Sequence, residues 1–213
     1  MAWLAVFAAL GLLVLVYWIP VRRWFTRWGA SGEDLARSMA GDGCVEHPSY
    51  QATLAVTIDG DPEHVWPWLL QMGYRRGGLY SYDWLDRLFG YLDRPSATRI
   101  LPEFQHLNPG DEIPIGRAGG FPIKAVDPQR ALVLAGQGEG VAWAWQFGIV
   151  RLDARHTRLI SRNSVRTPPG IGSWLFMRLI EPAAFLMTRR MLLGVKQRAE
   201  ALAAEGWPHT DAA

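Results

Sequence analysis

Three hydrophobic patterns follow one another along the chain, and the first is an uninterrupted apolar run. Residues 1–21 contain no charged side chain. As a helix they would span roughly 30 Å, which matches the hydrocarbon core of a bilayer. Trp3 and Trp18 lie near the two ends of the run, and Arg22 and Arg23 follow it. This arrangement is typical of a single-pass transmembrane helix. We therefore predict an anchor in the cell membrane at 1–21, with the rest of the chain in the cytoplasm.

Two alternatives to a membrane anchor stay open at the level of the sequence. A cleaved signal peptide normally has basic residues before its apolar region and a small-x-small cleavage site after it. No Lys or Arg precedes the run, and "YWIPVRR" is a poor cleavage site. The second alternative is a helix buried in the core of the protein.

The second pattern consists of short alternating segments separated by turn residues. "TLAVTI" at 53–58 predicts the first strand, and "DGDPEHVWPWLLQMG" predicts a helix that Asp61 caps and Gly73 ends. A second short helix is expected at 82–89, and strand segments separated by Gly- and Pro-containing turns follow it. In 141–149, Val, Trp, Trp, Phe and Ile alternate with Ala, Ala, Gln and Gly, so one face of this strand is bulky and apolar.

The third pattern is a long helix over about 173–204. Its first half is strongly apolar and its second half is amphipathic. Pro182 is expected to bend the helix, because proline removes a backbone donor and clashes with the preceding turn. The order of strand, two short helices, several strands and one long helix predicts an α+β domain, in which an antiparallel sheet curls around the last helix and leaves space between them.

Composition and charge narrow the function classes. The formal net charge of +2 gives no indication of a nucleic-acid-binding surface. Cys44 is the single cysteine, which excludes an intramolecular disulfide and a cysteine-based metal cluster. The five histidines are scattered without the spacing of paired metal ligands. We therefore expect no metal, no cofactor and no nucleic-acid partner.

The element order and the motifs within it resemble the START-like superfamily (SRPBCC), which includes Bet v 1-like and polyketide cyclase-like proteins. "TLAVTIDGDPEHVWPWLLQMG" resembles the first strand of the family and its PxxVWxxL helix. "RGGLYSYDWLDRLFG", "RILPEFQHLNPGDEI" and "EPAAFLMTRRMLLGVKQRAE" are similar to a narrower, membrane-linked bacterial subgroup. The resemblance covers about residues 50–204.

The resemblance implies a helix-grip fold, with a seven-stranded antiparallel sheet around the C-terminal helix and a hydrophobic cavity between them. Members of the superfamily bind lipids, sterols, polyketides or other apolar molecules, and a minority are enzymes. We accordingly expect a transmembrane anchor at 1–21, a connector at 22–50, a ligand-binding domain at 51–205 and a tail at 206–213.

The segment "WPWLLQMGYRRGGLYSYDWLDRLFG" at 66–90 combines large aromatics with glycines, which suits one wall of an apolar cavity with a few polar contacts. The alternative is that these aromatics only pack the helices on the sheet. Arg162 faces either the ligand or water. Together with the aromatic strand, the cavity mouth and the last helix, the expected ligand-binding residues are Trp66, Leu70, Tyr80, Tyr82, Trp84, Arg99, Glu103, Trp143, Trp145, Phe147, Arg162, Phe176, Ile180 and Met187.

These observations predict a membrane-tethered module that binds or transfers a hydrophobic small molecule, such as a lipid, isoprenoid or polyketide-like compound. One alternative is an acid–base enzyme such as a cyclase or hydratase, with Asp83, Glu103, Tyr80 or Tyr82 near its substrate. The other is a ligand-free scaffold for a membrane protein partner. The chain contains no nucleophile elbow, phosphate-cradling loop or HExxH motif, so no catalytic residue is assigned.

Overall fold

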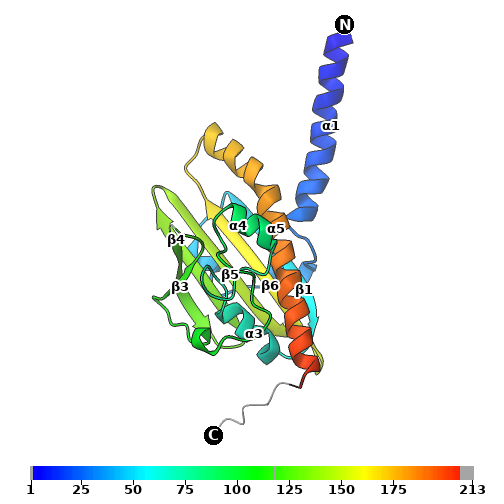
Figure 1. Cartoon of the computed structure of the whole chain (residues 1–213). Coiled ribbons are helices and arrows are strands. Elements are labelled where there is room, and N and C mark those ends of the chain that lie inside the picture. The colour runs from blue at the N-terminus through cyan, green and yellow to red at the C-terminus, as the bar shows by residue number, and fades with distance from the viewer. Residues whose placement is uncertain (1, 118, 207–213) are drawn as a thin grey trace.

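The computed structural model describes residues 2–117 and 119–206, and it consists of an antiparallel sheet with helices on both faces (Figure 1). Two short helices lie between the first and second strands, and one long helix follows the last strand. The elements are α1 (Ala2–Phe25), α2 (Gly32–Ala36), η1 (Asp42–Cys44), β1 (Tyr50–Asp59), α3 (Pro62–Leu70), α4 (Asp83–Leu88), η2 (Pro102–Phe104), β2 (Glu112–Pro114), β3 (Gly120–Asp127), β4 (Ala131–Gly138), β5 (Val141–Arg151), β6 (His156–Arg166) and α5 (Ile171–Ala204).

The sheet has the strand order β1-β6-β5-β4-β3-β2, and every neighbouring pair is antiparallel. Over the described residues it has six strands, so the expected number of seven is wrong. The chain between α4 and β2 carries Pro95, Pro102 and Pro109, and Pro102 begins the 3-10 helix η2. Proline has no N–H to donate to a strand ladder, which is a physical reason for the shorter sheet. The expected α+β class, with an antiparallel sheet and a long C-terminal helix, is confirmed.

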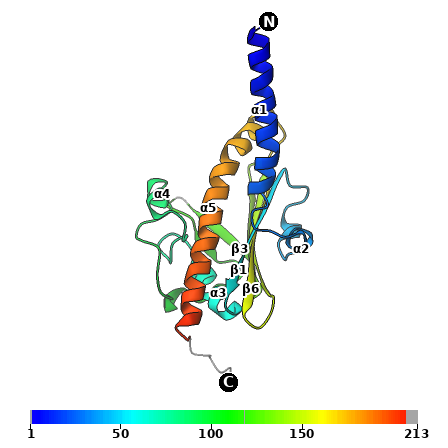
Figure 2. The ribbon, with the colours of Figure 1, turned by 90° about the vertical axis from the view of Figure 1, so that its right-hand side faces the viewer.

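The core lies between the inner face of the sheet and α5. From β1, Leu54 and Ile58 point into it, and Phe185, Leu192 and Val195 enter from the helix. Figure 2 shows α5 running along one side of the sheet. Burial of side chains of this size stabilises the fold by about 1.5–3 kcal/mol each, so this contact between the two ends of the domain holds it together.

The outer face of the sheet is covered by residues 26–46, with α2 on the side opposite α5 (Figure 2). Arg162 of β6 is buried there, and its Nη1 donates to Asp42 Oδ2 at 2.8 Å. Gln146 of β5 donates from Nε2 to Asp42 Oδ1 at 2.7 Å and accepts the Gly41 N–H through Oε1 at 2.7 Å. These buried polar groups are satisfied by one another, so they fasten this segment to the sheet.

No helix among the described residues is long and apolar enough to cross a membrane. The predictions of a transmembrane anchor and of a membrane location are therefore wrong. The apolar run is part of α1, which continues to Phe25, and the last turns of this helix pack on protein. Phe25 is buried, with ring centroids 6.4 Å from Trp18 and 5.7 Å from Phe185 of α5. Arg22 Nε donates to the fully buried carboxylate of Glu181 at 2.7 Å.

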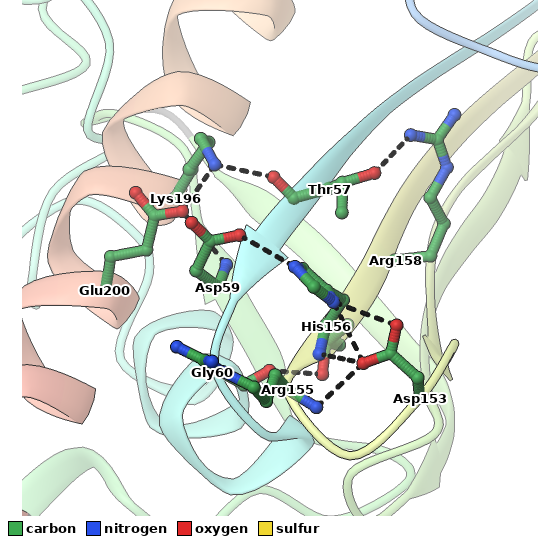
Figure 3. Close-up of polar contacts among 10 residues, drawn as sticks. Thr57, Asp59, Gly60, Asp153, Arg155, His156, Arg158, Lys196 and Glu200 are labelled. Carbon is green, nitrogen blue, oxygen red and sulfur yellow. Dashed lines mark hydrogen bonds and ion pairs between the residues drawn. The ribbon is translucent and has the colours of Figure 1, made fainter.

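A polar network fixes the C-terminal half of α5 on the end of β1 (Figure 3). Lys196 Nζ donates to the Thr57 carbonyl at 2.7 Å and forms an ion pair with Glu200. Glu200 in turn accepts the Asp59 N–H at 2.9 Å. On the other side of β1, His156 contacts the Asp59 carboxylate at 3.6 Å. These contacts fix the position of the C-terminal half of α5 relative to the end of β1.

Candidate functional site

Tyr80 is the residue around which the aromatic and glycine-rich segment is organised. It is 2% exposed, and its hydroxyl donates to the Trp68 carbonyl at 3.1 Å. The Trp68 ring meets it edge-on, and the Arg198 guanidinium lies 4.7 Å above its centroid. A Cβ at Gly194 of α5 would be 2.2 Å from the Tyr80 carbonyl oxygen, and one at Gly77 would be 2.6 Å from the Tyr80 hydroxyl. Both glycines are therefore needed for this close packing.

The apolar pocket is a cavity of about 550 Å³ between α3, residues 98–102 and the C-terminal half of α5. Arg198 is held at its edge, because Nε donates to the Ala97 carbonyl at 2.8 Å and Nη1 to the Gly194 carbonyl at 3.1 Å. Trp68 Nε1 is buried and has no acceptor among the described residues. The lining residues are Trp68, Thr98, Arg99, Ile100, Pro102, Gln197, Arg198, Ala201, Leu202, Glu205 and Gly206.

The opposing wall of the apolar pocket is shaped by Gln71. This side chain is fully buried, and it donates from Nε2 to the Arg99 carbonyl at 3.2 Å and accepts the Leu101 N–H at 2.8 Å. Gln105 Nε2 also donates to Gln71 Oε1, at 3.2 Å. Backbone N–H and C=O groups outside helices and strands need other hydrogen-bond partners. Gln71 provides them for Arg99 and Leu101, and it thereby fixes the position of residues 98–102 relative to α5.

The arginine pocket is a wider hollow of about 840 Å³ between α4, Pro95 and α5, and Tyr80 is one of its lining residues. Asp83 at its rim accepts the Ser96 N–H at 3.0 Å and the Ser96 hydroxyl at 2.7 Å. Burial lowers the pKa of Arg198, which lines both pockets, and neighbouring Arg190 lowers it further. The lining residues are Tyr80, Ser81, Tyr82, Asp83, Trp84, Arg87, Pro95, Arg189, Arg190, Leu193 and Arg198.

The expected aromatic face of β5 is on the inner side of the sheet. Trp143 and Trp145 are half-buried, Phe147 is fully buried, and Phe121 of β3 stacks against Trp143 with centroids 4.3 Å apart. Trp145 Nε1 donates to Ser161 Oγ of β6 at 3.0 Å. These rings pack mainly on each other, and none of them lines either pocket described above.

The remaining expected ligand residues are dispersed. Tyr80, Tyr82 and Trp84 share the arginine pocket, whereas Arg99 lines the apolar pocket. Trp66 and Leu70 are buried in the core, and Met187 is half-buried on α5. Glu103 is exposed on η2, and Phe176 and Ile180 are exposed on the first half of α5. Arg162 lies on the outer face of the sheet, away from both pockets.

Of the four acid–base groups considered for catalysis, Tyr80, Tyr82 and Asp83 lie in the arginine pocket and Glu103 does not. Asp83 already accepts two hydrogen bonds from Ser96, and Glu103 is exposed. Burial raises the pKa of the Tyr80 hydroxyl, which also donates to a backbone carbonyl. Asp86 of α4 is fully buried beside Ser81, and burial raises the pKa of its carboxyl. A general acid or base must reach the reacting group; Tyr80, Tyr82 and Asp83 line the arginine pocket together, whereas Glu103 lines neither pocket.

Sequence reasoning missed Gln71, Gly194 and Arg198. A glycine inside an amphipathic helix was a usable signal for Gly194, because such a glycine often marks a close approach by another segment. The sequence carried no comparable signal for Gln71 or Arg198, because each side chain forms hydrogen bonds with residues 28 to 101 positions away in the chain.

Asp61, Glu63 and His64 at the start of α3 form a cluster of possible metal ligands, which the spacing of the histidines in the sequence did not predict. Each offers a ligand atom, and these atoms lie within 4.8 Å of one another. Asp61 and His64 both have partners in the structure. Asp61 forms an ion pair with Arg151, and His64 Nδ1 accepts the Asp61 N–H at 3.0 Å in a capping box. These contacts explain the local helix start without an ion.

Comparison with known proteins gives similarity at the level of fold. No protein-family model matches the chain, and no match was found among curated proteins. Solved structures do align with it. The aromatase/cyclase Zhui from Streptomyces sp. R1128 is 17% identical with a TM-score of 0.44, over 74% of this chain and 98% of that one. A protein from Mesorhizobium loti is 15% identical with a TM-score of 0.44, over 71% and 98%.

A third neighbour, CalU16 from Micromonospora echinospora, is 16% identical with a TM-score of 0.34, over 72% of this chain and 86% of that one. All three TM-scores are below 0.5 and all three identities are below 25%, so these alignments show neither the family nor the activity of this chain. At such identities the likeness concerns the fold alone. The function must therefore be argued from the pockets of this chain.

Proposed function

We propose that this protein binds a hydrophobic small molecule, such as a lipid, isoprenoid or polyketide-like compound, in the apolar pocket. The observation that carries the proposal is the cavity of about 550 Å³ beside Trp68, Ile100 and Leu202. Ligand sites typically have volumes of about 300–1,000 Å³ and apolar walls with a few placed polar groups.

The polar groups at this pocket suit an amphipathic ligand. Arg198 is oriented by two backbone carbonyls at the pocket edge. The buried Trp68 N–H lacks an acceptor among the described residues, so a ligand oxygen that reached it would complete its hydrogen bonding. An apolar body with a small number of oxygens is the chemistry that these walls favour.

The test is a titration of the delipidated full-length protein with Nile red, a neutral dye that fluoresces in apolar surroundings, and its displacement by dodecan-1-ol. Ala201 lines the apolar pocket and is exposed, so Ala201→Trp fills the cavity without entering the core. Ala183 is an exposed alanine of the same helix that lines neither pocket, so Ala183→Trp is the matched control.

We expect A201W to weaken binding at least tenfold, while A183W binds like the unaltered protein. Far-UV circular dichroism checks that both variants fold. Equal affinities of the two variants would contradict the proposed location. Native mass spectrometry of the protein before delipidation then identifies the class of any ligand that purifies with it.

A further inference from the structure

In the part of the chain that the structure describes, buried and half-buried arginine side chains donate hydrogen bonds to oxygen atoms. Two of these arginines are exceptions. The buried Arg162 donates to Asp42, and the half-buried Arg158 donates to Asp34 Oδ2 at 3.1 Å through its Nε. Arg198 donates to two backbone carbonyls. Arg189 and Arg190, adjacent on α5 and both half-buried, have no hydrogen bond or ion pair to any described oxygen.

The surroundings of Arg189 and Arg190 are aromatic rather than acidic. The Arg189 guanidinium lies 4.8 Å from the centroid of Trp28, and its buried Nε has no acceptor. The Arg190 guanidinium lies 5.9 Å from the centroid of Tyr82. Cation–π contacts offset part of the cost of removing a guanidinium from water, but a buried donor without an acceptor still carries a desolvation penalty.

Both side chains line the arginine pocket, and Arg87 and Arg198 line it as well. Asp83 is the one acid among the lining residues, and both of its oxygens already accept hydrogen bonds from Ser96. The pocket therefore brings four arginines together with one carboxylate, and its lining residues carry an excess of positive charge. Burial lowers the pKa of Arg198, Tyr80 and Asp83 raise it, and Arg190 lowers it.

We propose that the arginine pocket is a second binding site, and that it takes an organic anion with an apolar body and a carboxylate or phosphate group. The planar guanidinium fork donates two parallel hydrogen bonds to either group. Tyr82, Trp84 and Leu193 supply apolar surface for the body of the same molecule. The arginine pocket shares Arg198 with the apolar pocket, whereas Arg189 and Arg190 line the arginine pocket alone.

The experiment compares four probes by isothermal titration calorimetry on the full-length protein at pH 7.5: dodecanoate, dodecyl phosphate, dodecan-1-ol and inorganic phosphate. Below their critical micelle concentrations, at least one of the two anionic amphiphiles is expected to bind at least tenfold more tightly than dodecan-1-ol and than inorganic phosphate. The better of the two tells which acidic group the site prefers. Its affinity should fall as NaCl rises from about 0.05 to 0.5 M, because salt screens the attraction.

The variant is Arg190→Gln, and the matched control is Arg130→Gln. Arg130 is an exposed arginine in the turn between β3 and β4 that lines neither pocket, so its substitution changes the net charge equally. R190Q is expected to lose about tenfold in affinity for the preferred anion, with dodecan-1-ol affinity and thermal stability unchanged, whereas R130Q keeps full affinity.

Three results would overturn the proposal: equal binding of dodecan-1-ol and both anionic amphiphiles, equal binding of inorganic phosphate and the amphiphiles, or equal loss of anion affinity in R190Q and R130Q. Failure here is distinguishable from failure of the proposed function. The neutral probes and A201W report on the apolar pocket, whereas the anion preference and R190Q report on the arginine pocket.

Discussion

We predict that replacing Gly194 by alanine destabilises the protein, although Gly→Ala within a helix usually stabilises. Within a helix, Gly→Ala normally stabilises by about 1 kcal/mol, because glycine has the higher backbone entropy in the unfolded chain. At Gly194 an added Cβ would be 2.2 Å from the Tyr80 carbonyl oxygen and 2.9 Å from the Tyr80 Cβ. Both opposing atoms belong to a residue that is 2% exposed, so neither can rotate away.

The magnitude follows from two opposing contributions. Overpacking in a dense interior costs about 1–3 kcal/mol, and a contact with fixed backbone belongs at the upper end of that range. Subtracting about 1 kcal/mol of helix propensity leaves a net destabilisation of about 2 kcal/mol. The structural consequence is a displacement of Tyr80 from α5, and the arginine pocket that Tyr80 lines changes shape with it.

The assay is urea unfolding of the full-length protein at 25 °C, followed by far-UV circular dichroism. Gly172→Ala is the internal control, because Gly172 belongs to the same helix and a Cβ there would have no atom within 4 Å. We expect G172A to be as stable as the unaltered protein or up to about 1 kcal/mol more stable. If G194A proves as stable as G172A, the close packing of Tyr80 on α5 at Gly194 is refuted.

Two further predictions concern the junction of α1 and α5. Glu181→Ala removes a fully buried carboxylate that accepts from Arg22 at 2.7 Å and pairs with Arg178. Because two partly buried guanidiniums lose their counter-ion, we expect a loss of about 3 kcal/mol in the same urea assay; a loss below about 1 kcal/mol would contradict the pairing. Burial, and secondarily the charge of Glu181, raises the pKa of Tyr50 to about 12. An unfolded tyrosine ionises near pH 10, so the folded protein binds the extra proton between about pH 10 and 12, and stability falls as pH rises through that window. Tyr50→Phe should make this fall shallower, and an identical pH profile in the variant would show that Tyr50 is not shielded.

Local periodicity was sufficient for the secondary structure of the domain. The alternation in "TLAVTI" and "VAWAWQFGI" predicted β1 and the inner face of β5, because successive side chains of a strand point to opposite faces. Asp61 and Pro62 marked the start of α3, where the structure has a capping box. The long last helix follows equally from its sequence pattern. These features depend on residues close in the chain, and so did the α+β class.

The apolar composition of α1 was insufficient to decide whether this helix crosses a membrane. An apolar helical surface suits lipid and a protein interior equally, since both remove it from water. The packing of Phe25 against Phe185 and the pairing of Arg22 with Glu181 join residues about 160 positions apart. No pattern within the first 25 residues encodes that partner. The expected anchor needed correction because no described helix is long and apolar enough to cross a membrane.

The sequence by itself determined the elements, their order and which strand faces are apolar. The tertiary structure alone decided what the polar and aromatic side chains do. Arg162 could face inward or outward by alternation, and it joins the outer layer because Asp42 lies there. Tyr80 meets α5 at Gly194, more than a hundred residues later, and Tyr80 lines the arginine pocket, whose wall shares Arg198 with the apolar pocket. Pockets form between segments distant in the chain, and their shape depends on side-chain packing that no local period contains.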